Sequence, residues 1–203
     1  MSTNVVEWQD AAVEIETPYG PARAHTQQVE NAVATMVLGH GAGGGVSAPD
    51  LMVASRAALE RQVSVALVEQ PYRVAGRKSQ PAATQLDAAW IAAVEMLRAP
   101  GLPLIVGGRS AGARVACRTA AETGAAGVLC LAFPVHPPGK PEKSRLDELD
   151  GVRVPVLVVQ GERDPFGMPP EAPNRTVVKV AGDHSLKTDL EAVATAIGSW
   201  LPV

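Results

Sequence analysis

The sequence predicts an α/β fold in which a mostly parallel sheet carries helices on both faces. Short apolar runs rich in β-branched residues alternate with longer helix-like segments along the chain, and this alternation is typical of such a sheet. The runs lack the strict apolar–polar alternation of half-exposed strands, which indicates strands that are buried on both faces. A length of 203 residues with 46% hydrophobic residues suits a single domain over residues 1–203 with a substantial core.

The predicted elements begin with a hairpin-like stretch. Val13–Thr17 and Ala22–Val29 flank a Pro-Tyr-Gly-Pro turn and are expected to form two paired strands. The runs expected as buried strands are Ala34–Leu38, Val63–Val68, Leu104–Val106, Val128–Ala132, Val154–Val159 and Thr176–Val180. The segments expected as helices are Pro49–Arg61, Pro81–Arg98, Ser110–Thr123 and Lys187–Trp200. The stretch Phe133–Asp150 is expected as one long irregular connection, too short to hold a helical lid of any size.

Composition and charge argue against several classes of function. The net charge of −3 without a long basic run disfavours a nucleic-acid binder or a membrane-surface helix, and a content of 3% aromatic residues offers little for base stacking. No apolar stretch is long enough to span a bilayer, and the acidic N-terminus lacks an apolar signal core. We therefore expect a cytoplasmic protein. Cys117 and Cys130 are expected as buried reduced thiols, and the four histidines lack metal-binding spacing, so we expect neither a metal nor a cofactor.

The strongest functional signal is a serine between two glycines, after a buried run and before a helix-like segment. The stretch Leu104–Gly112 reads LIVGGRSAG, which matches the G-x-S-x-G pattern of a nucleophile elbow. A tight strand-to-helix turn there holds the serine in a strained conformation, with its Oγ above the sheet. Side chains at Gly108 and Gly112 would collide with neighbouring backbone. The pattern predicts Ser110 as a nucleophile.

Acyl transfer also needs two hydrogen-bond donors for the oxyanion. One is expected to be the backbone N–H of Ala111, at the start of the helix that follows Ser110. The glycine-rich loop Gly39–Gly45, which reads GHGAGGG after the first buried run, is where the second donor belongs. Its best candidate is the N–H of Ala42.

An aspartate and a histidine follow Ser110 in the order Ser, Asp, His that a catalytic triad is expected to have after such an elbow. Asp164 lies just past the end of the run Val154–Val159, and His184 lies just past the end of Thr176–Val180. Both positions belong to the edge of the sheet at which parallel strands end, so the two side chains are expected to meet Ser110 there. Asp183, directly before His184, is the alternative acid, but adjacent side chains usually point apart, and Asp183 is expected to bond to local backbone.

The chain resembles a minimal α/β-hydrolase throughout its length. The segments GHGAGG, GGRSAG, HPPGKPEK and QGERDPFG are similar to those of the dienelactone-hydrolase-like group, which includes the testis-expressed hydrolase-like proteins. This resemblance implies an α/β-hydrolase fold and a triad of Ser110, Asp164 and His184 acting on a small-molecule acyl substrate. One departure is that Ala111 stands where this group is expected to have methionine, which implies a roomier acyl pocket.

Two other functions fit parts of the sequence. Gly39–Gly44 also matches G-x-G-x-x-G, with Glu69 at the end of the next run, which is the outline of a dinucleotide-binding loop. That alternative leaves Ser110, Asp164 and His184 without a role. A hydrolase-like interaction module without activity is the second alternative. In the irregular connection, His136 and the lysines Lys140 and Lys143 either contact substrate or belong to a solvated loop.

Overall fold

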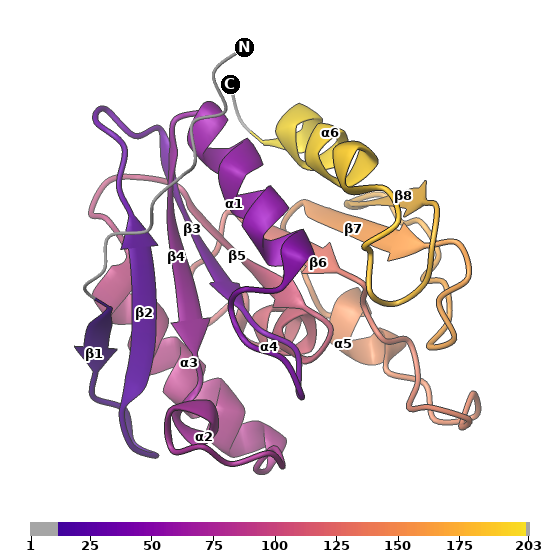
Figure 1. Cartoon of the computed structure of the whole chain (residues 1–203), viewed down its shortest axis with the longest axis horizontal. Helices are drawn as coiled ribbons and strands as arrows, with labels where there is room; N and C mark the ends of the chain where they lie inside the picture. The colour runs from indigo at the N-terminus through magenta and orange to yellow at the C-terminus, as the bar shows by residue number, and fades with distance from the viewer. Residues whose placement is uncertain (1–11, 202–203) are drawn as a thin grey trace.

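The computed structural model describes residues 12–201 of the chain. The acidic stretch in which no signal core is expected lies mostly outside these residues. The described residues form an eight-stranded sheet with the order β1-β2-β4-β3-β5-β6-β7-β8, layered between helices (Figure 1). β1 and β2 pair antiparallel, as do β2 and β4, and the other pairs are parallel. This arrangement confirms the predicted α/β fold and the N-terminal hairpin.

The strands follow the predicted apolar runs. They are β1 (Val13–Ile15), β2 (Ala22–Gln27), β3 (Ala34–Gly39), β4 (Val63–Glu69), β5 (Leu104–Arg109), β6 (Gly127–Leu131), β7 (Val156–Gly161) and β8 (Arg175–Val180). Every residue of β3, β6 and β7 is buried, as expected for strands covered on both faces. The carboxyl ends of the six parallel strands therefore meet at one edge, where the predicted site residues follow β3, β5, β7 and β8.

The helices cover both faces of the sheet. They are α1 (Pro49–Glu60), α2 (Pro71–Val74), α3 (Ala83–Leu97), α4 (Ala111–Thr119), α5 (Leu146–Asp150) and α6 (Leu190–Trp200). Apolar residues of α1 and α6 form one core with one face of the sheet, and those of α3, α4 and α5 form a second core with the other face. In Figure 1 the first pair lies in front of the sheet and the other three helices lie behind it.

Three local features differ from the sequence prediction. The connection Phe133–Asp150 is not irregular throughout, because it ends in α5, and α2 was not predicted either. Each is about one turn long, which is too short to show helical periodicity. The helix predicted from Ser110 begins one residue later, because Ser110 itself has a positive φ of 52°. Cys117 and Cys130 are free and buried as expected, but they also contact each other, with 3.5 Å between their Sγ atoms.

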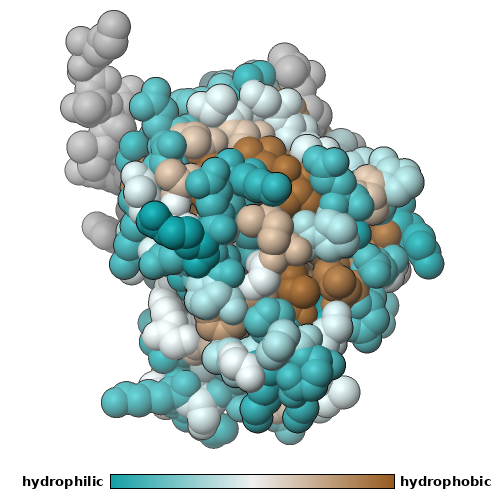
Figure 2. Space-filling view, turned by 90° about the vertical axis from the view of Figure 1, so that its right-hand side faces the viewer, coloured by the Kyte–Doolittle hydropathy of each residue, from teal (hydrophilic) through white to brown (hydrophobic). Residues whose placement is uncertain are grey.

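The side of the molecule that carries β8 and α6 is mostly polar. Its apolar side chains gather in small groups that are separated by polar ones (Figure 2). None of the helices in residues 12–201 is long and apolar enough to cross a membrane.

Candidate active site

Ser110 occupies a strained turn between β5 and α4. Its φ and ψ are 52° and −106°, a region that residues other than glycine rarely adopt. The backbone N–H of Ser110 donates to the carbonyl oxygen of Leu131 on β6 at 2.8 Å, which anchors the turn to the sheet. The flanking glycines make the close packing feasible, because a Cβ at either Gly108 or Gly112 would collide with the carbonyl oxygen of Gly39. The sequence therefore folds here into the predicted elbow.

The structure brings the three predicted side chains Ser110, His184 and Asp164 together. His184 Nε2 lies 2.9 Å from Ser110 Oγ, and His184 Nδ1 lies 2.7 Å from Asp164 Oδ2. The Asp164 side chain is fully buried, whereas the imidazole of His184 keeps 17% of its surface exposed. Because a carboxylate only accepts hydrogen bonds, Nδ1 carries the proton and Nε2 is left to accept from the serine hydroxyl. This arrangement can draw a proton from Ser110 and stabilise the imidazolium that forms.

Two residues that the sequence did not indicate hold Asp164 in place. Gln160 at the end of β7 is completely buried, and its Nε2 donates to Asp164 Oδ2 at 2.8 Å. The backbone N–H of Phe166 donates to the other carboxylate oxygen at 2.8 Å. The Phe166 ring also packs on the imidazole of His184, with 4.2 Å between the ring centroids. Both oxygens of Asp164 are thus engaged, and these two donors fix its orientation toward His184.

Gln160 can be placed in one orientation only. Its Nε2 lies 2.8–3.0 Å from Asp164 Oδ2 and from the carbonyl oxygens of Phe133 and Gly167. All three are acceptors, so the amide nitrogen and not the amide oxygen faces them. The sequence feature that could have indicated this role is a polar glutamine at the end of an otherwise apolar, buried strand.

Asp183 faces away from the imidazole. Its Oδ1 accepts from the backbone N–H of Ser185 at 2.8 Å and from the Ser185 hydroxyl at 2.7 Å. These hydrogen bonds lower the pKa of the exposed Asp183 carboxyl below its ordinary value. The structure thus places this carboxylate in a local turn, and Asp164 is the acid in contact with His184.

The two candidate oxyanion donors come from two different segments of the chain near Ser110. Ala111 is the first residue of α4, so its N–H has no carbonyl one turn earlier to donate to. Gly41 and Ala42 follow β3, and a Cβ at Gly41 would lie 3.8 Å from Ser110 Cβ, so this loop is next to the serine. The hydroxyl of Tyr72 donates to the Ala42 carbonyl oxygen at 3.0 Å and holds the loop from the α2 side.

His40 fixes the direction of the Gly41–Ala42 peptide. His40 Nε2 accepts from the backbone N–H of Gln70 at 3.1 Å, so Nδ1 carries the proton and donates to the Gly41 carbonyl oxygen at 2.8 Å. Because a trans peptide points its C=O and N–H in opposite directions, this bond turns the Ala42 N–H away from His40. Burial is the main cause that lowers the pKa of His40 below its ordinary value of 6.5, which favours the neutral ring that this pattern requires.

Arg109, which lies between Gly108 and Ser110, connects the elbow to two other segments. Its Nε lies 3.0 Å from Asp50 Oδ2 at the start of α1, and its Nη2 donates to the backbone carbonyl of His184 at 3.1 Å. Neither Arg109 nor Asp50 was identified from the sequence, because a charged residue near a helix start is most often a solvated one. Asp50 is instead fully buried.

The remaining candidates lie outside the Ser110–His184–Asp164 chain. His136 donates through its backbone N–H to the Phe166 carbonyl oxygen at 3.2 Å, and its Nδ1 lies 3.0 Å from the Pro137 carbonyl oxygen, so it lies beside the loop that carries Asp164. Lys140 and Lys143 are exposed, and the backbone N–H of Lys143 donates to the carbonyl oxygen of Lys140 in a turn. Glu69, which a dinucleotide site would require, lies within 4 Å of His25 and Arg23 in the β2–β4 ladder.

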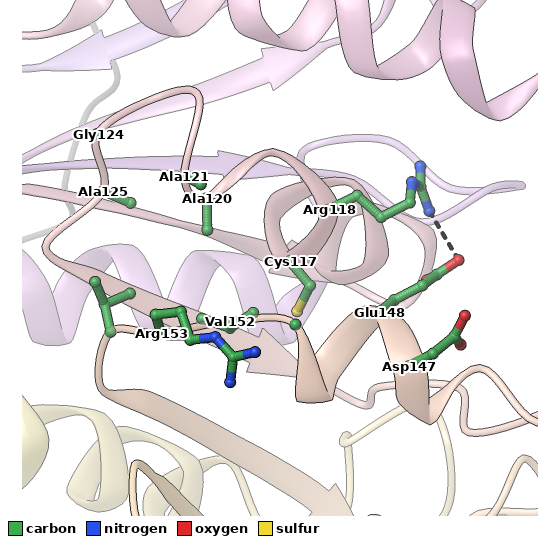
Figure 3. A pocket seen from close by; sticks show the side chains of 12 residues that line it. Cys117, Arg118, Ala120, Ala121, Gly124, Ala125, Asp147, Glu148, Val152 and Arg153 are labelled. Carbon is green, nitrogen blue, oxygen red and sulfur yellow. Dashed lines mark hydrogen bonds and ion pairs between the residues drawn. The ribbon is translucent and has the colours of Figure 1, made fainter.

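A cavity of about 640 Å³ lies elsewhere, between the C-terminal end of α4 and α5. Figure 3 shows that Cys117 and Glu148 line it, and neither Ser110, Asp164 nor His184 does so. Within residues 12–201 no group of three or more His, Cys, Asp or Glu side chains could hold a metal ion.

Comparisons with known proteins place these observations in a family. Residues 32–199 match the family described as alpha/beta hydrolase domain. A sequence search of curated proteins found no match.

Several solved structures share the fold. A serine hydrolase without lid from Xanthomonas campestris is 24% identical, with a TM-score of 0.74 over 95% of each chain. Dienelactone hydrolase from Anabaena variabilis is 16% identical, with a TM-score of 0.74 over 95% of this chain and 96% of that one. The esterase Pf2001 from Pyrococcus furiosus is 17% identical, with a TM-score of 0.74 over 95% of this chain and 89% of that one. At these identities the likeness shows the fold alone.

Proposed function

Because the chain belongs to the family of alpha/beta hydrolase domains, we propose that it is a serine hydrolase that cleaves small acyl esters or related bonds. Ser110 is the nucleophile, His184 the general base and Asp164 its orienting acid. The observation that carries this proposal is the continuous hydrogen-bonded chain from Ser110 Oγ through the imidazole to the buried Asp164 carboxylate. A catalytically silent interaction module has no need of three such groups in register.

The proposed reaction has two halves. Ser110 Oγ attacks the carbonyl carbon while its proton passes to His184 Nε2, and the oxyanion accepts hydrogen bonds from the N–H groups of Ala42 and Ala111. When the tetrahedral intermediate collapses, the bond to the leaving alcohol breaks and the imidazolium returns the proton to that alcohol. Water then attacks the acyl-enzyme with the same proton transfers in sequence, which releases the acid and restores Ser110.

The shape of the β6–β7 connection supports a small substrate. It holds α5, a helix of five residues, and no larger insertion. The site is therefore proposed to offer little apolar wall against a long acyl chain, whose burial would contribute about 0.8 kcal/mol per methylene. Within the family we place the chain in the dienelactone-hydrolase-like group that includes the testis-expressed hydrolase-like proteins, because its segments GHGAGG and QGERDPFG are similar to theirs.

Hydrolysis of p-nitrophenyl acetate and butyrate by the purified full-length chain tests this proposal. We expect turnover by the wild type and none above background by Ser110→Ala. The matched control is Ser185→Ala, which removes an exposed serine hydroxyl next to His184 that bonds only to Asp183 among the described residues. Its kcat should stay within about threefold of wild type, since the hydroxyl lies outside the proton path. Equal activity of wild type and Ser110→Ala would refute the proposal.

A further inference from the structure

The guanidinium group of Arg109 joins the parts of the proposed site that the chain supplies from distant positions. It extends from the residue directly before Ser110, lies 3.0 Å from the Asp50 carboxylate, and donates to the His184 carbonyl at 3.1 Å. Its Nη1 also packs against Gly41, where a Cβ would approach this nitrogen to 2.8 Å. The elbow, the start of α1, the histidine loop and the oxyanion loop therefore all meet at one side chain.

The buried carboxylate of Asp50 is the ion-pair partner of the Arg109 guanidinium group. Its side chain has no exposed surface, while that of Arg109 keeps 20%. Burial raises the pKa of the Asp50 carboxyl and the nearby Arg109 charge opposes this rise. The second carboxylate oxygen accepts from the backbone N–H of Leu51 at 3.0 Å, so the carboxylate is fixed to the helix start. A buried carboxylate without a cation is unfavourable, so Arg109 and Asp50 constrain each other.

The carbonyl oxygen of His184, at the centre of the histidine loop, accepts a hydrogen bond from a distant segment of the chain. Arg109 is the one hydrogen-bond donor to the His184 carbonyl among the described residues. The loop itself bends tightly, with positive φ values at Gly182 and Leu186. The residues on either side are held by other hydrogen bonds, from the Arg163 N–H to the Gly182 carbonyl oxygen at 2.9 Å and from the Leu186 N–H to the Asp183 carbonyl oxygen at 3.1 Å.

We propose that Arg109, anchored by Asp50, is a positioning residue that fixes the backbone of His184 relative to Ser110. This inference rests on the proposed function for its catalytic consequence, but the contact itself does not. The planar fork of arginine is essential to the role, because it reaches the Asp50 carboxylate through Nε and the His184 carbonyl through Nη2 at the same time. A lysine supplies one compact charge, which can face Asp50 but does not span both partners.

The conservative variant Arg109→Lys separates positioning from charge compensation. It keeps a cation beside Asp50, so the melting temperature should stay near that of wild type, whereas the loop loses its anchor. We expect faster amide hydrogen exchange in peptides covering residues 181–188, by about tenfold or more. We also expect kcat on p-nitrophenyl butyrate to fall by about 10–100-fold with KM changed less than about twofold, since misplacement of a catalytic group by about 1 Å costs about 10²-fold.

Two further variants complete the test. Asp50→Asn removes the anionic partner and leaves the Arg109 guanidinium, which keeps 20% of its surface exposed, without a counter-ion; it should change loop exchange and kcat in the same direction as Arg109→Lys. The matched control is Arg118→Lys, at a similarly buried arginine that bonds to Asp87 and lies 3.3 Å from Glu148 (Figure 3). Its kcat and the exchange of residues 181–188 should both stay within about twofold of wild type, because the pair does not contact His184.

The possible outcomes distinguish a failure of the positioning role of Arg109 from a failure of the proposed hydrolase function. Unchanged exchange of residues 181–188 in both Arg109→Lys and Asp50→Asn would overturn the inference, whatever the activity. Faster exchange with unchanged kcat in an active enzyme would also overturn it, since the contact would then be structural only. Faster exchange in Arg109→Lys and Asp50→Asn, together with a wild-type chain that hydrolyses no ester, would support the anchor and refute the proposed function.

Discussion

Replacing Asp164 by asparagine keeps the size of the side chain but cannot keep all of its hydrogen bonds. The carboxylate accepts from His184 Nδ1 and Gln160 Nε2 at one oxygen and from the Phe166 N–H at the other. An amide NH₂ in place of the first oxygen faces a donor from Gln160 and forces His184 Nδ1 to accept. The ring proton then moves to Nε2, which can no longer accept from Ser110. An NH₂ in place of the second oxygen faces the Phe166 N–H instead.

The expected loss in kcat is about 10³–10⁴-fold, as for this role in other triads. At about 1.36 kcal/mol per factor of ten this corresponds to about 4–5.5 kcal/mol of transition-state stabilisation. The buried donor left without a partner should lower the free energy of unfolding by about 1–3 kcal/mol. The assay is steady-state hydrolysis of p-nitrophenyl butyrate, with thermal unfolding measured on the same preparations.

Asp183→Asn is the matched control for this prediction. Asp183 is exposed, and within residues 12–201 its carboxylate forms hydrogen bonds with Ser185 only, so its replacement should lower kcat by less than about tenfold. A larger loss for Asp183→Asn than for Asp164→Asn would refute the assignment of the acid while leaving Ser110 and His184 untouched.

Three further predictions follow from the contacts around the site. Gln160→Leu removes a donor to the Asp164 carboxylate and should lower kcat by about 10–100-fold, since a hydrogen bond to a charged group contributes about 1.5–3 kcal/mol; an unchanged kcat would contradict the role of Gln160. Burial lowers the pKa of His40 below 6.5, so its contribution to stability is complete above that pH and is lost as the unfolded chain takes up the proton below it. The melting temperature of wild type should therefore fall more than that of His40→Asn between about pH 7 and about pH 5.5, and parallel curves would exclude a neutral buried His40. Finally, kcat/KM should be higher for acetyl and butyryl esters than for acyl chains of about 12 carbons, because the short β6–β7 connection supplies little apolar wall; a steady rise with chain length would indicate a groove for the acyl chain.

The sequence was informative wherever backbone geometry dictates residue type. Gly108 and Gly112 are required because any Cβ there collides with Gly39. The spacing of these two glycines around Ser110 therefore identifies the elbow in the sequence. Asp164 and His184 could be placed together because parallel strands end at the same edge of a sheet. The hydrophobic runs likewise predicted the buried strands to within a few residues.

Contacts that depend on loop conformation were not predictable in this way. Arg109 and the His184 carbonyl are 75 residues apart, and their meeting depends on the tight bend of the histidine loop. Gln160 could be recognised as a partner of Asp164 only once the turn after β7 was known. The single-turn helices α2 and α5 were not predicted because a single turn shows no helical periodicity of apolar residues.

The central claim is that Ser110 is an activated nucleophile, and labelling of the full-length chain with a fluorophosphonate tests it most directly. In this reaction a bond forms between Ser110 Oγ and phosphorus, the phosphorus–fluorine bond breaks, and fluoride leaves while His184 takes up the hydroxyl proton. Intact mass and peptide mapping should show one label per chain, on the peptide that contains Ser110, and none on a folded Ser110→Ala variant. Equal labelling of that variant, or an unlabelled wild type, would contradict the account.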